Sequence, residues 1–221
     1  MMNTTKSTMT INKRRSFWRI LSDAIIEFIL WISRVRIRTE NMEAIPQDGK
    51  FLLVANHVSM FDPIVVLKLM KKYHMLFVSK PENFRIPIGG FLMKKCGFIS
   101  IDRENARNAI QSIYAAAEII REDGCPMGVY PEGTRNKEPE KGLLPFHNGV
   151  FKIAKRAEAP IVVAVTENTD HVSKNWPWKR TEVVFSVIDV INRENASSQN
   201  DRMLGERIRA DMEEKLYGQA I

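Results

Sequence analysis

Short apolar runs alternate with helical patterns along the chain from residue 51 onward. Apolar runs of four to seven residues, bounded by polar residues, Gly or Pro, predict buried strands. Between them, stretches with apolar positions at helical spacing predict helices. The predicted strands are Phe51–Ala55, Met75–Ser79, Phe98–Ile101, Met127–Tyr130, Ile161–Thr166 and Glu182–Ile188. The predicted helices are Pro63–Lys72, Pro87–Lys95, Glu104–Arg121, Gly149–Arg156 and Asp201–Tyr217.

This alternation is typical of an α/β protein, because strands that follow one another through helices favour a largely parallel or mixed sheet. The polar stretches 135–147 and 171–180 are predicted loops, and neither is long enough to divide the chain. A length of 221 residues, 44% of them hydrophobic, fits one domain with an ordinary core. We therefore expect a single α/β domain over residues 35–221, with a mixed, largely parallel central sheet flanked by helices.

Residues 1–34 differ from the rest and predict a basic segment with an amphipathic helix. Residues 1–38 hold eight Lys and Arg side chains against Asp23 and Glu27, a net charge of +6 in a chain whose total is +7. Within this part, residues 17–32 are mostly apolar, and Arg19, Asp23 and Glu27 recur every four residues, which places them in one narrow polar stripe. A membrane span needs about 20 mostly apolar residues, so this stretch is too short and too charged to cross a bilayer.

We expect this helix to lie in the interface of a membrane. Trp18 and Trp31 near its ends, together with the basic flanks, suit the boundary between lipid and water. Each basic residue beside an anionic leaflet stabilises binding by about 1 kcal/mol. Since the first dozen residues are polar and no cleavable secretory signal follows, we expect a monotopic protein on the cytoplasmic face of the cell membrane. The pattern leaves a second interpretation open, in which the helix packs on the domain or on another subunit.

Composition argues against several other classes of protein. Cys96 and Cys125 lie far apart without a C-x-x-C motif, which opposes a disulfide framework or a zinc site and fits a reducing compartment. The histidines lack the spacing of metal ligands, so no metal is expected. The basic residues flank apolar ones and form no nucleic-acid-binding signature, so nucleic acid is not an expected partner.

The most informative motif is the stretch Asn56-His57-Val58-Ser59-Met60-Phe61-Asp62, at the end of an apolar run. Asp is a favoured N-cap and Pro63 suits the first helical position, so His57 and Asp62 are predicted to bracket a strand-to-helix turn. If the turn folds back, the carboxylate can hold one imidazole nitrogen and leave the other as a general base. The spacing alone leaves a structural interpretation open, in which Asp62 only caps the helix.

Two further predicted strands end in residues with functional chemistry. Tyr130-Pro131-Glu132-Gly133-Thr134-Arg135 follows one of them, and Asp102-Arg103 follows another. Gly133 permits a positive φ, and Arg135 offers a planar fork suited to phosphate. In open α/β sheets ligands gather outside the carboxyl ends of the strands. Each feature taken singly also fits a solvated turn or a surface ion pair.

The combination resembles a known family. N-H-x4-D, then G-x5-R at Gly97 and Arg103, then Y-P-E-G-T-R, in this order, is similar to the blocks of the glycerolipid acyltransferases. The likeness is strongest to the members that acylate 1-acylglycerol 3-phosphate (lysophosphatidic acid). The strand at Ile161 and the preceding Ala159-Pro160 resemble the family's fourth block, and the likeness covers roughly residues 35–190.

The resemblance implies an enzyme of phospholipid biosynthesis. It would transfer an acyl group from acyl-CoA or acyl-ACP, as co-substrate, to the 2-hydroxyl of the lysophospholipid, with no other cofactor. His57 would be the general base and Asp62 its orienting carboxylate. Arg103 and Arg135 would hold the acceptor's phosphate, and Glu132, Gly133 and Thr134 would shape that pocket. The expected partners are therefore an anionic membrane surface, the lysophospholipid, and CoA or acyl carrier protein.

Three alternatives remain open at this stage. The enzyme could acylate another lysophospholipid or glycerol 3-phosphate. The chain could be a non-catalytic lipid-binding module of the same fold. It could also be a hydrolase, although it has no G-x-S-x-G, and Ser59 lies inside the turn rather than on its own elbow.

Overall fold

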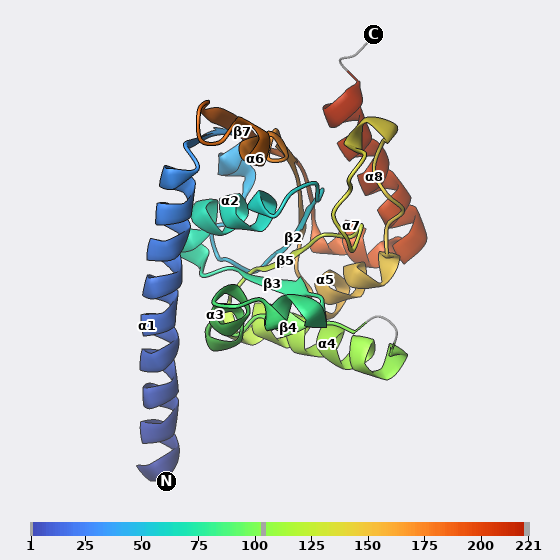
Figure 1. Cartoon of the computed structure of the whole chain (residues 1–221). Helices are drawn as coiled ribbons and strands as arrows, with labels where there is room; N and C mark the ends of the chain where they lie inside the picture. The colour runs from blue at the N-terminus through green and yellow to red at the C-terminus, as the bar shows by residue number, and fades with distance from the viewer. Residues whose placement is uncertain (1, 103–104, 219–221) are drawn as a thin grey trace.

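Seven strands form one sheet with helices on both sides (Figure 1). The computed structural model describes residues 2–102 and 105–218, with side chains described from residue 17 onward except that of residue 106. The strands are β1 (Val35–Glu40), β2 (Leu52–Ala55), β3 (Leu76–Ser79), β4 (Ile99–Ser100), β5 (Met127–Val129), β6 (Ile161–Glu167) and β7 (Thr181–Ile191). The helices are α1 (Met2–Ile32), α2 (Phe61–Leu69), α3 (Gly89–Cys96), α4 (Ala106–Glu118), α5 (Lys152–Ala157), α6 (His171–Asn175), α7 (Arg193–Ser198) and α8 (Asp201–Tyr217).

The strand order is β1-β7-β6-β2-β5-β3-β4. The neighbours from β6 to β4 run parallel, β6 and β7 run antiparallel, and β1 runs parallel to β7. The prediction of a mixed, largely parallel sheet flanked by helices is therefore confirmed. Because β2 lies between β5 and β6, the loops after these two strands flank the turn that follows β2.

Each of the six predicted strands corresponds to an observed one, with ends that differ by up to three residues. β1 was missed because its sequence, Val-Arg-Ile-Arg-Thr-Glu, alternates apolar and charged residues and pairs only with β7. The short helices α6 and α7 were missed because they are too brief to show a helical period.

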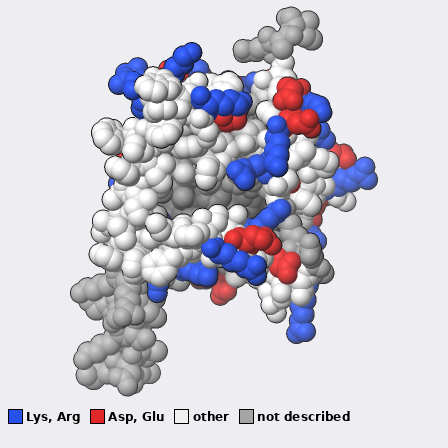
Figure 2. Space-filling view, in the orientation of Figure 1, with Lys and Arg blue, Asp and Glu red and all other residues white. Residues whose placement is uncertain are grey.

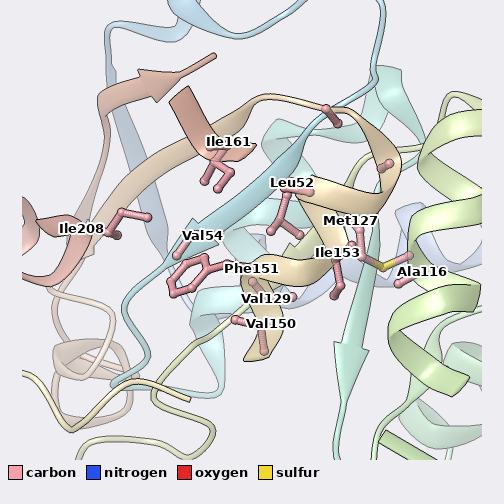
Figure 3. Packing of buried hydrophobic residues seen from close by; sticks show 14 of the residues in the cluster. Leu52, Val54, Ala116, Met127, Val129, Val150, Phe151, Ile153, Ile161 and Ile208 are labelled. Atoms are coloured by element: carbon pink, nitrogen blue, oxygen red, sulfur yellow. The ribbon is translucent and has the colours of Figure 1, made fainter. Parts of the chain in front are cut away.

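Alternate residues of the central strands fill two separate cores. Leu52 and Val54 point to the side covered by α4, α5 and α8, and Figure 3 shows this packing. Leu53 and Ala55 point to the opposite side, which α2 covers. Successive side chains of a strand face opposite sides of its sheet, so a strand buried on both faces is apolar throughout, as β2 is.

The helix α1 packs along the domain, and its polar stripe faces inward. Ile26 and Leu30 are buried in a small core with residues of α2 and β7. In the polar stripe, Glu27 forms ion pairs with Lys68 and Lys71, and the Arg19 guanidinium donates to the carbonyl of His74. Arg19 and Glu27 therefore help to hold this helix to the domain.

From residue 17 to its end at Ile32, the outward face of α1 is apolar. Its exposed side chains lie at positions three or four apart, so they form one continuous stripe. A helix on a water-soluble surface has the opposite arrangement, with its polar residues outside. Within the described residues, no helix is long and apolar enough to cross a membrane. The stripe consists of Phe17, Ile20, Leu21, Ala24, Phe28, Trp31 and Ile32.

Candidate active site

The predicted site residues that the structure describes gather at one edge of the sheet. Of the predicted residues, His57 follows β2 and Glu132 follows β5. The buried Thr169, which was not predicted, follows β6 at the same edge. Since these three strands are adjacent and parallel, their carboxyl ends meet at the same edge. The strand order therefore explains why residues over a hundred positions apart are in contact.

His57 and Asp62 form a hydrogen-bonded pair. His57 Nδ1 lies 2.8 Å from Asp62 Oδ2. The carboxyl group is fully buried, whereas the imidazole retains 17% of its surface exposed. A carboxylate accepts hydrogen bonds, so Nδ1 carries the proton and Nε2 of the neutral ring has a free lone pair. Within the described residues Nε2 makes no hydrogen bond, which suits a general base.

Asp62 is not the N-cap that the sequence suggested. The helix α2 begins at Phe61, so Asp62 is its second residue. Its Oδ2 accepts the backbone N–H groups of Val58 and Ser59, at 2.8 and 2.7 Å. The carboxylate therefore closes the turn that precedes the helix, and the same oxygen also receives His57 Nδ1.

Thr169 completes the surroundings of Asp62, although no sequence pattern pointed to this residue. Its side chain is fully buried, and its hydroxyl donates to Asp62 Oδ1. The two carboxylate oxygens are thus held from opposite sides, Oδ2 by the turn and Oδ1 by the loop after β6. A threonine just after an apolar strand is common, so only the neighbouring position of β6 and β2 reveals this contact.

We expect the Thr169 hydroxyl to position the His57–Asp62 pair. Thr169→Val keeps the shape but removes the donor, which should lower kcat about tenfold with little change in KM, because a hydrogen bond to a charged group is worth about 1.5–3 kcal/mol. Thr169→Ser retains the hydroxyl and should stay close to wild type. Steady-state kinetics of the two variants tests this, and equal losses in both would show that Thr169 acts only through packing.

Glu132 supports the backbone of the turn. One carboxylate oxygen accepts the N–H of His57 at 2.7 Å, and the other accepts the N–H of Leu144 at 3.0 Å. Burial raises the pKa of this carboxyl, and the two N–H donors partly oppose that rise. Glu132 therefore ties the β2 turn to the far end of the loop after β5.

Other backbone contacts hold His57 and its neighbours. The N–H of Asn136 donates to the carbonyl of His57 at 2.7 Å. The buried Asn56 amide exchanges two hydrogen bonds with the backbone of Thr166 in β6, at 3.0 and 2.8 Å. The turn is therefore attached on one side to β6 and on the other to the loop after β5, which limits its motion.

An aromatic stack packs on the imidazole. The ring of Tyr130 lies parallel to that of His57, with centroids 4.3 Å apart and planes 16° apart. Phe77 of β3 stacks on the other side of Tyr130 at 5.2 Å. A side chain at Gly128 would collide with the Phe77 ring, so glycine is required there. Burial raises the pKa of the Tyr130 hydroxyl well above its usual value, so this stack stays uncharged.

The loop after β5 presents the predicted phosphate-binding residues outward. Gly133 has φ +72°, the positive value that the sequence led us to expect. Thr134 and Arg135 next to it are exposed. Arg103 lies outside the described residues, so its predicted place beside Arg135 stays a prediction. Ser59 is buried, and its oxygen accepts the N–H of Phe61 at 3.2 Å, an arrangement that does not present it as a nucleophile.

Comparisons with known proteins give a consistent result. A family model described as Acyltransferase matches residues 36–166. A 1-acyl-sn-glycerol-3-phosphate acyltransferase of Haemophilus influenzae is 31% identical over 176 residues, which cover 78% of this chain and 72% of that protein. A protein of the same name from Saccharomyces cerevisiae is 24% identical over 194 residues, 87% of this chain and 62% of that protein.

A solved structure has the same fold. The crystal structure of the 1-acyl-sn-glycerophosphate (LPA) acyltransferase PlsC from Thermotoga maritima superposes with a TM-score of 0.65 and 22% sequence identity. The superposition covers 98% of this chain and 84% of that one. At this identity the likeness concerns the architecture alone. The contact between His57 and Asp62 is seen in the structure of this chain.

Proposed function

Since the chain belongs to the acyltransferase family, we propose that it transfers a fatty acyl group from an acyl thioester to the 2-hydroxyl of 1-acylglycerol 3-phosphate. The product would be phosphatidic acid, a precursor of phospholipids. The observation that supports this best is the His57–Asp62 contact, which leaves Nε2 free on the partly exposed side of the ring. The names of the relatives favour this acceptor over other lysophospholipids.

The reaction needs one base and no covalent enzyme intermediate. Nε2 of His57 takes the proton of the acceptor hydroxyl while that oxygen attacks the thioester carbonyl carbon. The C–S bond then breaks, and the leaving thiolate recovers the proton from the imidazolium. The buried charge of Asp62 stabilises the imidazolium while it exists. Atoms and charge balance, so no cofactor is required.

We place the phosphate of the acceptor at the loop after β5. Arg135 is exposed in this loop, two residues after Gly133, which has a positive φ. A guanidinium binds phosphate through two parallel hydrogen bonds, which suits this role. Arg103 would supply a second cation from the segment that follows β4, and Glu132 would keep the loop in place through its two backbone contacts.

Arg135→Lys tests this assignment. Lys keeps the charge but lacks the planar fork, so we expect the KM for the acceptor to rise about tenfold with kcat little changed. The matched control is Arg193→Lys, since Arg193 is exposed and paired only with the neighbouring Glu194 in the described structure. An acceptor KM equal to that of the wild type would remove Arg135 from the phosphate site.

We further propose that the protein is attached to a membrane surface. Between residues 17 and 32 the outward stripe of α1 is apolar while Arg19 and Glu27 face the domain, and this suits burial in the interface of a leaflet. On the side of the molecule turned to the viewer, Figure 2 shows an uncharged area around α2 and α3, with a hollow in it and Lys and Arg side chains along its edges. A lipid acceptor would then reach the site without crossing water.

The experiment that tests the function is an acyl-transfer panel. Purified full-length protein is given acyl-CoA or acyl-ACP with each of several acceptors: 1-acylglycerol 3-phosphate, other lysophospholipids and glycerol 3-phosphate. We expect the highest kcat/KM with 1-acylglycerol 3-phosphate. Both donors are acidic, and the net charge of +7 suits either. A clear preference for another acceptor would assign a different substrate to the same chemistry.

A further inference from the structure

The chain makes a strained turn just before α3. Ile88 has φ 62° and ψ −61°, and the N–H of Gly89 donates to the carbonyl of Pro87 at 2.6 Å. This is a γ-turn with a positive φ at its centre, a rare conformation. For a β-branched residue a positive φ is a genuine outlier, and such strain is found where the surrounding structure imposes it and function uses it.

Close packing behind the turn maintains this conformation. Gly90 is buried, and a side chain there would lie 2.5 Å from the carbonyl of Phe84. The N–H of Gly90 also donates to the carbonyl of Ile86 at 2.8 Å. The backbone of α3 is therefore fixed against the preceding 3₁₀ turn, and the strained residue is held in place although its own side chain makes little contact.

The turn presents an exposed apolar surface, which we call the turn patch and define as Ile86, Pro87, Ile88 and Phe91. Ile86 is 52% exposed, Ile88 70% and Phe91 48%. The Phe91 ring meets the Trp18 ring of α1 edge to face, with centroids 5.1 Å apart. Trp18 in turn meets the ring of Phe17, with centroids 5.2 Å apart. Since Phe17 belongs to the outward stripe of α1, the turn patch adjoins that stripe through Trp18.

Basic side chains surround the turn patch. Lys95 Nζ lies 5.4 Å from the centre of the Phe91 ring and 5.9 Å from that of Trp18. Arg85 and Lys94, which flank the turn patch in sequence, are exposed. Residues 80–95 hold four basic side chains against one acidic residue, Glu82, a net charge of +3. An apolar surface with a cationic rim is complementary to an anionic leaflet.

We propose that the turn patch is a second contact with an anionic phospholipid leaflet, separate from α1. This proposal rests on the proposed function, because it assumes that the active site works at a membrane. The segment that carries it leaves β3 at the same edge of the sheet as the β2 turn, so insertion of Ile88 brings the leaflet to the mouth of the site. A rigid turn inserts without first having to be ordered, which favours binding.

Ile88→Gly separates this role from a structural one. Glycine adopts φ 62° without strain, so the melting temperature should stay equal or rise. The apolar side chain is lost, so half-maximal binding to vesicles of phosphatidylcholine with about one third phosphatidylglycerol should need about five to ten times more lipid. Co-sedimentation measures this binding without any turnover.

Two further variants and one activity assay complete the test. Phe28→Ser on the outward stripe of α1 should weaken binding similarly, whereas Met203→Ala, an exposed apolar residue on α8, should not change it. Activity on a short-chain acceptor dispersed in water should be unchanged in Ile88→Gly. If the wild type transfers no acyl group but Ile88→Gly still binds vesicles less tightly, the proposed function fails and the leaflet contact stands.

Three results would overturn the proposal. The first is vesicle binding by Ile88→Gly equal to that of the wild type. The second is a loss of activity on the dispersed acceptor, which would make the turn part of the acceptor site. The third is a change in oligomeric state in Ile88→Gly on size-exclusion chromatography, which would make the turn patch an interface between two copies of the chain.

Discussion

His57→Ala is expected to lower kcat by about 10²–10⁴-fold, the usual contribution of a positioned general base. The imidazole is the only described group at this edge with a free basic nitrogen held by a buried carboxylate. The fold should survive, because Asp62 keeps its contacts with Val58, Ser59 and Thr169. We expect the melting temperature to fall by no more than about 2–4 °C.

His74→Asn is the matched control for His57→Ala. His74 precedes β3 at the opposite end of the sheet, and it has φ 56°, a conformation that asparagine tolerates. Its kcat should equal that of the wild type. Added imidazole should restore part of the activity of His57→Ala by entering the space that the side chain leaves. A turnover of His57→Ala near that of the wild type would remove His57 from the mechanism.

Asp62→Asn should be nearly as damaging to catalysis, yet the protein should remain folded. The oxygen of the asparagine amide can accept from the three N–H donors that Oδ2 serves in the wild type. The NH2 group of the amide can then donate to the Thr169 hydroxyl, which becomes an acceptor instead of a donor. The negative charge at residue 62 is lost, however, so its stabilisation of the imidazolium during proton transfer is lost too. We expect kcat to fall by about 10²–10⁴-fold and the melting temperature by about 2–8 °C.

Kinetics and thermal unfolding of Asp62→Asn are best measured beside Asp189→Asn. Asp189 forms a partly exposed ion pair with Arg207, 2.8 Å away and far from the site, so this control should change neither quantity much. Thr169→Val combined with Asp62→Asn should lower stability further, because valine cannot accept from the new NH2. A full kcat in Asp62→Asn would show that His57 works without a charged partner.

Sequence patterns were sufficient for most of the fold. Buried strands such as β2 and β6 are continuous apolar runs, and α8 shows its period clearly enough for both ends to be predicted. The strand β1 was missed because its charged residues suggest a loop, and only pairing with β7 makes it a strand. That pairing depends on residues some 150 positions away, which no local pattern reports.

The His57–Asp62 pair was likewise visible in the sequence, but its surroundings were not. The spacing of His57 and Asp62 and the loop from Tyr130 to Arg135 gave the chemistry. Thr169 and Asn56 became significant only once β6 was found beside β2. The sequence pattern also could not show which face of α1 meets the domain. The polar stripe predicts a helix with two faces, but whether Glu27 faces water or Lys68 depends on how the domain packs.

The central claim is that this chain transfers an acyl group to a lysophospholipid hydroxyl. It is tested most directly by following thiol release and phosphatidic acid together, with purified full-length protein and an acyl thioester, in the presence and absence of 1-acylglycerol 3-phosphate. We predict one phosphatidic acid for each thiol released, and almost no thiol release without the acceptor. Thiol released at the same rate in both cases, with no phosphatidic acid formed, would contradict the claim and indicate a thioester hydrolase.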